Sequence, residues 1–252
     1  MPTAGSSIFA ARTIRPTTTS ASSAGSEDGC GGIPGSWTTF AAWSIAHRCG
    51  RPYDLGVSED ELVIDPRQTG LSRLDFRELF GNDHRVVLEI GSGKGRFLIA
   101  SAMEQPEVNF IGIEKSLHYH RVIRERVLKR ALRNVRLINY DADPVLREMI
   151  PDASLAEIHI YFPDPWPRKR EQKRRIIRSD ALAEMRRTLV AAGSGIYVTD
   201  HREYFEAAAP LIAELFRAEA RVPGPDDPPR TNYEAKYRAE GREIYEVRFW
   251  KG

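Results

Sequence analysis

Cysteine is scarce in this chain, and long apolar runs are absent from it. Its 2 cysteines, Cys30 and Cys49, both precede the part of the chain that we expect to fold. Their spacing is that of neither a disulfide framework nor a zinc site. No apolar run approaches the roughly 18 residues that a membrane span needs. We therefore expect a cytoplasmic protein, held in a reducing compartment, that does not cross a membrane.

Histidine is also sparse, with 6 in the chain. His118, His120 and His201 stand at no spacing typical of metal ligands, so the sequence predicts no metal site. The rest of the composition is that of a globular protein, because 41% of the residues are apolar and 29% are charged. This is enough to build a core for one large α/β domain, or at most two small ones.

Apolar periodicity is missing from the start of the chain. Among the first 26 residues, 11 are serine or threonine, and glycine and proline interrupt the stretch that follows. Such a composition cannot bury enough apolar surface to form a core. We therefore predict a disordered, low-complexity tail over residues 1–60 and a folded domain over residues 61–252.

Strand and helix patterns alternate along the folded domain. Apolar runs predict strands at residues 86–90, 109–114, 135–139, 157–162, 196–199 and 244–250. Helical spacing predicts helices at residues 71–80, 97–103, 117–132, 144–150, 179–191 and 204–216. The alternation predicts an α/β fold with a mostly parallel sheet. The last strand alternates strongly and is predicted to lie at an antiparallel end of that sheet.

A glycine-rich turn follows the first of these strands. Gly91, Gly93 and Gly95 come directly after the apolar run and open a helix, as in nucleotide-binding βαβ units. The third glycine comes one residue too early for the dinucleotide fingerprint. Glu89 stands two residues before the first glycine, where a carboxylate suits a cationic ligand better than a phosphate. An oxidoreductase that uses a dinucleotide is therefore disfavoured.

Two further acids follow the next two strands. Glu114 lies 19 residues after Gly95, near the spacing of an acid that holds ribose hydroxyls. Asp141 follows the third strand and is predicted to line the same crevice. Each acid alone is typical of a solvated loop or a helix cap. Together, three acids at successive strand ends indicate a ligand made of an amino acid, a ribose and an adenine without phosphate, which is S-adenosylmethionine.

A stiff, charged segment follows the fourth strand. Three prolines surround Asp164 and Trp166 in the run Phe162–Pro167, and they fix the backbone where a substrate of this fold binds. A tryptophan can stack on a purine, and a carboxylate can accept hydrogen bonds from its N–H edge. From Phe162 to Arg178 the net charge is +5, whereas the remainder of the chain sums to −3. The segment predicts a surface for a polyanion, with a solvated helix face as the alternative.

These motifs together resemble the tRNA (guanine-N7)-methyltransferase family of the single-chain bacterial type. The likeness spans roughly residues 86–250. It is carried by the glycine turn with its preceding acid, by Gly112-Ile113-Glu114, Asp141-Ala142, Phe162-Pro163-Asp164-Pro165-Trp166-Pro167, Thr199-Asp200 and Thr231-Asn232-Tyr233-Glu234. It implies a Rossmann-like, class I S-adenosylmethionine-dependent methyltransferase domain. Its sheet is expected to be seven-stranded and mostly parallel, with an antiparallel end strand.

The resemblance also implies a role for each matching residue. Asp164 is expected at the catalytic centre. The cofactor S-adenosylmethionine is expected to contact Glu89, Gly91, Gly93, Glu114 and Asp141. The substrate is expected to contact Arg168, Asp200, Thr231, Asn232, Tyr233 and Glu234. The family commonly has lysine at position 168, and arginine keeps the charge while changing the geometry. Thr231 and Glu234 also fit the pattern of a helix capping box.

The expected activity is methyl transfer to N7 of a guanosine in tRNA, at the variable-loop guanosine by family resemblance. A methyltransferase that acts on another RNA, a protein or a small molecule remains an alternative, and a non-catalytic RNA-binding protein is a weaker one. The expected partner is tRNA. No membrane, metal or obligatory protein partner is expected, and the enzyme is expected to be a monomer or a homodimer.

Overall fold

The structure is a computed structural model that describes residues 57–224 and 226–252. The predicted tail over residues 1–60 therefore lies almost wholly outside the described residues and stays a prediction. The described part begins just ahead of α2 (Glu59–Leu62), close to the predicted start of the folded domain. Among these residues, no helix is both long and apolar enough to cross a membrane.

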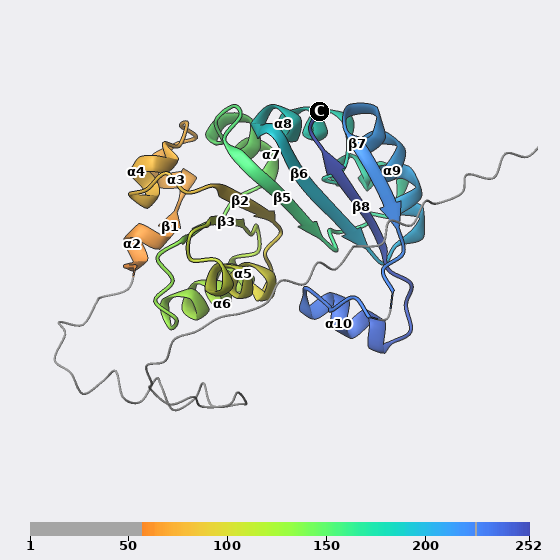
Figure 1. Cartoon of the computed structure of the whole chain (residues 1–252), viewed down its shortest axis with the longest axis horizontal. Helices are drawn as coiled ribbons and strands as arrows, with labels where there is room; N and C mark the ends of the chain where they lie inside the picture. The colour runs from red at the N-terminus through yellow and green to blue at the C-terminus, as the bar shows by residue number, and fades with distance from the viewer. Residues whose placement is uncertain (1–56, 225) are drawn as a thin grey trace, which may run out of the picture. The chain divides into compact units, whose positions relative to one another are not determined.

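A single sheet organises the described residues (Figure 1). Its strands follow the order β1-β4-β3-β2-β5-β6-β8-β7. Their bounds are β1 Val63–Ile64, β2 Val86–Ile90, β3 Asn109–Ile113, β4 Val135–Ile138, β5 Leu155–Tyr161, β6 Leu189–Thr199, β7 Arg217–Arg221 and β8 Tyr245–Trp250. The pairs from β1 to β6 are parallel, and β8 pairs antiparallel with both β6 and β7. The predicted α/β fold with a mostly parallel sheet and an antiparallel end is confirmed.

Helices cover both faces of this sheet. Beyond α2 they are α3 Pro66–Thr69, α4 Phe76–Phe80, α5 Arg96–Glu104, α6 Leu117–Leu128, α7 Ala142–Pro144, α8 Ser179–Thr188, α9 Arg202–Leu215 and α10 Asn232–Ala239. A π-helical turn, η2, spans Val145–Met149, and a 3₁₀ helix, η3, spans Lys169–Arg174. Figure 1 shows α5 and α6 on one side of the sheet and α8 and α9 on the other.

Alternate residues of the central strand enter two different cores. In β2, Val86, Leu88 and Ile90 pack in the core that also contains buried residues of η2, α8 and α9. Val87 points to the other face, into the core shared with α5 and α6. A strand that is buried on both faces must be apolar at nearly every position. The uninterrupted apolar run in the sequence has this cause, and its one exception is Glu89.

The region from 189 to 195 differs from its sequence-based prediction. We expected a helix to about residue 191, stopped by the glycines that follow. Instead α8 ends at Thr188, and Gly193 and Gly195 lie inside the long strand β6. A Cβ on Gly195 would lie 2.2 Å from the ring of Phe249 on β8. The glycine thus admits an aromatic ring from the neighbouring strand and does not end a helix.

Two strands were missed, and one lies elsewhere than expected. β8 is not at the edge, because β7 pairs with its outer side, and β1 extends the opposite end of the sheet. The sequence of β7, Arg-Ala-Glu-Ala-Arg, is largely exposed and lacks the apolar alternation that marks a strand. Strand β1 has only 2 residues. The seven-stranded expectation therefore becomes an eight-stranded sheet.

Candidate active site at the carboxyl edge of the sheet

The glycine turn lies between β2 and α5 and is held against β3. The backbone N–H groups of Gly91 and Ser92 donate to the Ile113 carbonyl at 2.8 and 3.0 Å. Gly91, Gly93 and Gly95 all have positive φ, at 79°, 52° and 74°, which favours glycine. At Gly95 the space is closed as well, since a Cβ would lie 2.4 Å from the Ile123 side chain. The turn therefore brings the backbone close to whatever occupies the crevice.

Glu89 is a buried carboxylate with a free oxygen. Its side chain lies on β2 just before the turn, the residue is 3% exposed, and Oε2 has no hydrogen-bond partner. Burial raises the pKa of Glu89 to about 8, and the neighbouring charge of Glu114 adds to the rise. An unpaired buried acid is costly. A cationic group that donates hydrogen bonds to Oε2 would satisfy it.

Glu114, at the end of β3, bridges the turn and the start of α6. Its Oε2 accepts from the Gly93 N–H at 2.8 Å, and its Oε1 accepts from the Ser116 N–H at 2.7 Å. Burial raises the pKa of Glu114, and the charge of Asp164 contributes to the rise although these hydrogen bonds oppose it. Asp164 therefore lies within electrostatic reach of Glu114. Glu114 thus lies within electrostatic reach of both Glu89 on β2 and Asp164 after β5.

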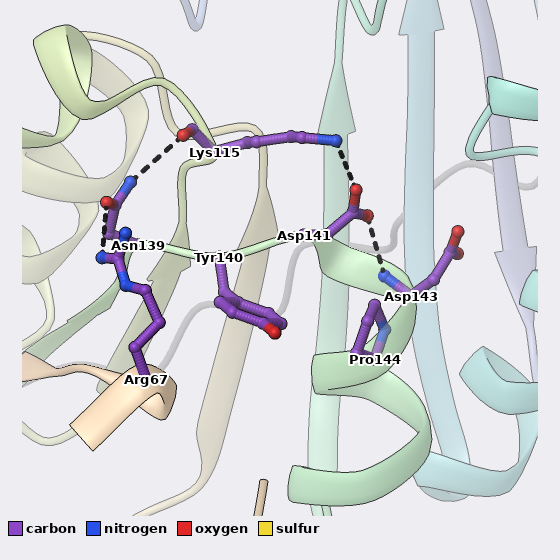
Figure 2. Close-up of a pocket in the computed structure, with 7 residues that line it drawn as sticks. All are labelled: Arg67, Lys115, Asn139, Tyr140, Asp141, Asp143 and Pro144. Atoms are coloured by element: carbon purple, nitrogen blue, oxygen red, sulfur yellow. Dashed lines mark hydrogen bonds and ion pairs between the residues drawn. The ribbon is translucent and has the colours of Figure 1, made fainter. Parts of the chain in front are cut away.

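Asp141 lies at the mouth of a neighbouring cavity of about 500 Å³. Figure 2 shows the Lys115 side chain reaching across to Asp141, which also accepts from the Asp143 N–H. Burial works against the ionised form, but the contact with Lys115 outweighs it and lowers the pKa of Asp141. Its side chain is 44% exposed. This carboxylate is ionised, held in place, and open to a ligand.

Of the residues that line this cavity, only Asp141 is among the sequence-based predictions. Lys115 follows Glu114 directly, and Asn139 donates through Nδ2 to the Glu114 carbonyl at 2.7 Å. Arg67, from α3, donates to the Asn139 side-chain oxygen at 3.0 Å and forms part of the wall (Figure 2). The positions of Lys115 and Asn139 at strand ends were a usable signal. Nothing in the sequence connects Arg67 to a site more than seventy residues later.

The proline-rich loop after β5 holds Asp164 in the open. Phe162 and Trp166 flank it with φ of 50° and 40°, values that cost a non-glycine residue free energy and cluster at functional sites. The Phe162 N–H donates to the Val198 carbonyl at 2.7 Å, and Arg175 Nε donates to the Pro165 carbonyl at 2.7 Å. The loop is thus fixed from both sides while the Asp164 side chain is exposed.

The basic segment divides into exposed and buried members. Arg168 is 70% exposed with only a distant acid, Glu171, at 3.9 Å. By contrast, Arg175 is buried beneath the loop and lies over the Tyr204 ring, 4.5 Å from its centroid. The guanidinium of Arg174 covers one face of Trp166 at 4.9 Å, so only the other face is left for a base. Arg175 is therefore not part of the predicted polyanion surface, whereas its exposed basic neighbours still are.

Helix α10 presents the Thr231–Glu234 block. Thr231 caps the helix by accepting from the Glu234 N–H at 3.0 Å, which confirms half of the capping box. Asn232 is exposed and accepts a 3.5 Å hydrogen bond from Arg96, next to the glycine turn. Tyr233 is 41% exposed, and a hydrogen bond with Tyr119 of α6 raises its pKa to about 12. The exposed part of the block therefore lies beside the start of α5 and beside α6.

Glu234 is fully buried, in contrast to Asn232 and Tyr233. Arg230 and Arg238 donate to its two carboxylate oxygens. Arg230 also pairs at 2.8 Å with Glu246, a second fully buried acid on β8. In this conformation Glu234 anchors the helix and offers no free oxygen to a substrate.

Asp200 follows β6 and is paired with Arg242 at 2.8 Å. The same guanidinium lies over the Tyr237 ring of α10, 4.3 Å from its centroid. This links the carboxyl end of β6 to the helix that carries Asn232. No group of histidine, cysteine or acidic side chains within residues 57–224 and 226–252 could hold a metal ion.

The known proteins that this chain is similar to are methyltransferases. The sequence model of a family described as "Putative methyltransferase" matches residues 83–247. A tRNA (guanine-N(7)-)-methyltransferase of Vibrio cholerae serotype O1 is 37% identical over 184 residues, which cover 70% of this chain and 77% of that protein. The enzyme of the same name from Shewanella amazonensis is 35% identical over 182 residues, covering 70% and 76%.

Among solved structures, one titled "Structure of an Antibiotic Related Methyltransferase" superimposes with a TM-score of 0.50 at 20% identity. It covers 72% of this chain and 96% of that one, and it supports the fold alone. The family match spans β2 to β7 and includes Glu89, Glu114, Asp141 and Asp164. The chain belongs to the tRNA (guanine-N7)-methyltransferase family.

Proposed function

We propose that this chain transfers a methyl group from S-adenosylmethionine to N7 of a guanosine in tRNA. The observation that carries the cofactor half is the unpartnered Oε2 of the buried Glu89, two residues before a glycine turn. A cationic amino group fits that position, and a phosphate does not. The names of the relatives support the substrate half. The variable-loop guanosine is the proposed target.

The residues of the crevice fit the three parts of this cofactor. Glu89 would accept from the amino group of the methionyl part, and Glu114 is placed for the ribose hydroxyls. Asp141 lies at the wall of the adjoining cavity, where the adenine would bind. Gly91 and Gly93 keep their side of the crevice free of side chains. When bound, the cofactor supplies an electrophilic methyl group on a sulfonium sulfur.

The protein's task in the reaction is placement. Guanine N7 carries a lone pair and no proton in the neutral base, so a general base is not required. Holding N7 in line with the methyl group can account for about 7–11 kcal/mol of the barrier. We assign Asp164 to this task, since it is exposed on a stiff loop and its charge reaches Glu114. Its carboxylate would also stabilise the positive charge that develops on the purine.

On the substrate side, the exposed residues are the proposed contacts. Arg168 would bind backbone phosphate, and Asn232 and Tyr233 would meet the nucleotides around the target. Asp200 would act by its ion pair with Arg242, which joins the carboxyl end of β6 to α10. Thr231 would act by capping α10. Glu234 is proposed to act by anchoring that helix, because Arg230 and Arg238 occupy both of its oxygens.

The proposed site draws on one chain only. Its acids come from the ends of β2 to β5, and its substrate helix is α10 of the same chain. We therefore propose that a monomer or a homodimer is active without an obligatory protein partner. A cytoplasmic location is part of the same proposal.

The Asp164→Asn and Asp164→Ala variants test the assignment. Radiolabelled S-adenosylmethionine is supplied with total tRNA, and the product is cleaved at 7-methylguanosine. We expect turnover to be abolished in Asp164→Ala while the affinity for S-adenosylhomocysteine, measured by calorimetry, falls only modestly. If Asp164→Ala binds no S-adenosylhomocysteine, the residue belongs to the cofactor site instead. Label that enters protein or a small molecule in the wild-type reaction would overturn the proposed substrate.

A further inference from the structure

A second basic surface lies beside the glycine turn, away from the segment after β5. From Leu117 to Asn134 the chain carries six basic residues against one acid, three on α6 and three just after it. Three guanidinium groups, those of Arg96, Arg126 and Arg130, line a groove of about 460 Å³ between α5 and α6. Asn232 of α10 also lines this groove. We call it the α5–α6 groove.

The three arginines have no acidic partner among the described residues. All three are exposed, and no carboxylate within residues 57–224 and 226–252 forms an ion pair with them. Arg126 donates to the Lys94 carbonyl at 2.8 Å, and Arg130 donates to the Arg126 carbonyl at 3.0 Å. These bonds fix the arginine stems and leave N–H groups free. Like charges gathered without counter-charges favour an anionic ligand.

The floor of the groove is apolar. Ile99, Ala100 and Met103 of α5 form it, and Met103 is 58% exposed. A free inorganic anion would gain nothing from such a floor. A nucleotide of a polynucleotide chain matches both parts, because its phosphate meets the guanidinium groups and its ribose or base packs on the apolar side chains.

We propose that the α5–α6 groove binds the sugar-phosphate backbone of the substrate tRNA, at nucleotides away from the methylated guanosine. The groove is continuous, through Asn232, with the helix that we place against the target. Arg96 connects the two, since it lines the groove and donates to Asn232 at 3.5 Å. The RNA would thus be held on two basic surfaces, after β5 and along α6. This inference rests on the proposed function and extends its substrate site.

The test is the salt dependence of tRNA binding by Arg130→Gln. Arg130 is chosen because it lies in the turn after α6, donates to the Arg126 carbonyl of that helix, and forms no ion pair within the described residues. Binding of an unmodified tRNA transcript is measured between 50 and 200 mM KCl. The slope of log affinity against log salt is negative, and each lost phosphate contact lowers its magnitude by about 0.7–0.9. We expect that decrease, with unchanged binding of S-adenosylhomocysteine and an unchanged unfolding midpoint.

Two further variants serve as controls. Arg147→Gln removes the same charge from an exposed position. Arg147 lies on η2, and the buried residues of η2 pack in the core on the opposite face of the sheet. Arg147→Gln should leave the slope at its wild-type value. Arg130→Lys, which keeps the charge, should recover most of the slope that Arg130→Gln loses. An unchanged slope in Arg130→Gln would overturn the proposal, as would an equal decrease in Arg147→Gln. Loss of S-adenosylhomocysteine binding in Arg130→Gln would also overturn it.

The groove and the proposed function can fail separately. If Arg130→Gln lowers the magnitude of the salt slope but the wild-type protein transfers no methyl group to tRNA, the proposed function fails and the groove stands. If the wild-type protein methylates tRNA and Arg130→Gln has an unchanged slope, the groove fails and the function stands.

Discussion

Single carboxylates carry most of the chemistry proposed for this protein, and their surroundings differ. Glu89 is buried without a partner for Oε2, Glu114 is buried but accepts two backbone hydrogen bonds, and Asp141 is ionised beside Lys115. The sequence located all three at strand ends. It could not assign their protonation, because that depends on burial and on neighbours from other strands.

Glu89 gives the sharpest prediction at this scale. Since burial raises the pKa of Glu89 to about 8, most of the unliganded protein is protonated there at pH 6.5. A cationic amino group requires the ionised carboxylate, so binding releases a proton and affinity rises as the pH increases from 6 toward 8. We expect Glu89→Gln to lose this dependence and about 1.5–3 kcal/mol of binding free energy, the value of a hydrogen bond to a charged group.

Calorimetry with S-adenosylhomocysteine, in two buffers of different ionisation enthalpy, counts the released protons. Glu219→Gln, at an exposed position of β7, is the matched control and should release as many protons as the wild type. An undiminished release in Glu89→Gln would mean that another group titrates.

At the scale of elements, the long strand β6 shows how a neighbour overrides local signals. The glycines at 193 and 195 predicted the end of a helix, yet they lie in a strand whose register shifts between Leu155 and Glu157 of β5. The need to fit the Phe249 ring decides the residue at 195. Turn chemistry and close packing both select glycine, and only the tertiary structure distinguishes them.

Gly195→Ala tests this interpretation. The added methyl group would overlap the Phe249 ring, so we expect a loss of about 1–3 kcal/mol in the free energy of unfolding, as for other overpacked cores. Chemical denaturation measures it. In a Phe249→Leu background the same substitution should cost less, because the ring is gone.

Gly224→Ala is the control for that experiment. A Cβ added at Gly224 would lie 3.8 Å from an Asp227 carboxylate oxygen, which is an ordinary van der Waals contact. The substitution should therefore leave the free energy of unfolding nearly unchanged. If Gly195→Ala has the same free energy of unfolding as the wild type, β6 and β8 adjust to the added methyl group without strain, which would contradict the interpretation.

For the whole molecule, the distribution of charge matters more than its sum of +2. The segment from Phe162 to Arg178 stays strongly basic after the structure removes Arg175 from its exposed members. Electrostatic attraction over a surface of this kind speeds and strengthens the binding of nucleic acid in a salt-dependent way.

A pair of substitutions separates surface charge from packing. Lys169→Gln removes an exposed cation and should lower the magnitude of the salt slope of tRNA binding by about 0.7–0.9 if it contacts a phosphate. Arg175→Gln removes a buried guanidinium that bonds to the Pro165 carbonyl and should instead cost about 1.5–3 kcal/mol of stability. Filter binding and thermal unfolding of both variants provide the measurements. A solvated helix face would leave the slope of Lys169→Gln unchanged.

The sequence by itself determined the fold class, the glycine turn and the positions of Glu89, Glu114, Asp141 and Asp164. It could do so because strand periodicity is local and because parallel strands bring their carboxyl ends to one edge. Only the tertiary structure decided that Arg175 and Glu234 are buried, that Arg67 borders the cavity beside Asp141, and that Arg96 and Arg130 share a groove. Those facts depend on contacts between segments far apart in the chain, and no local pattern encodes such contacts.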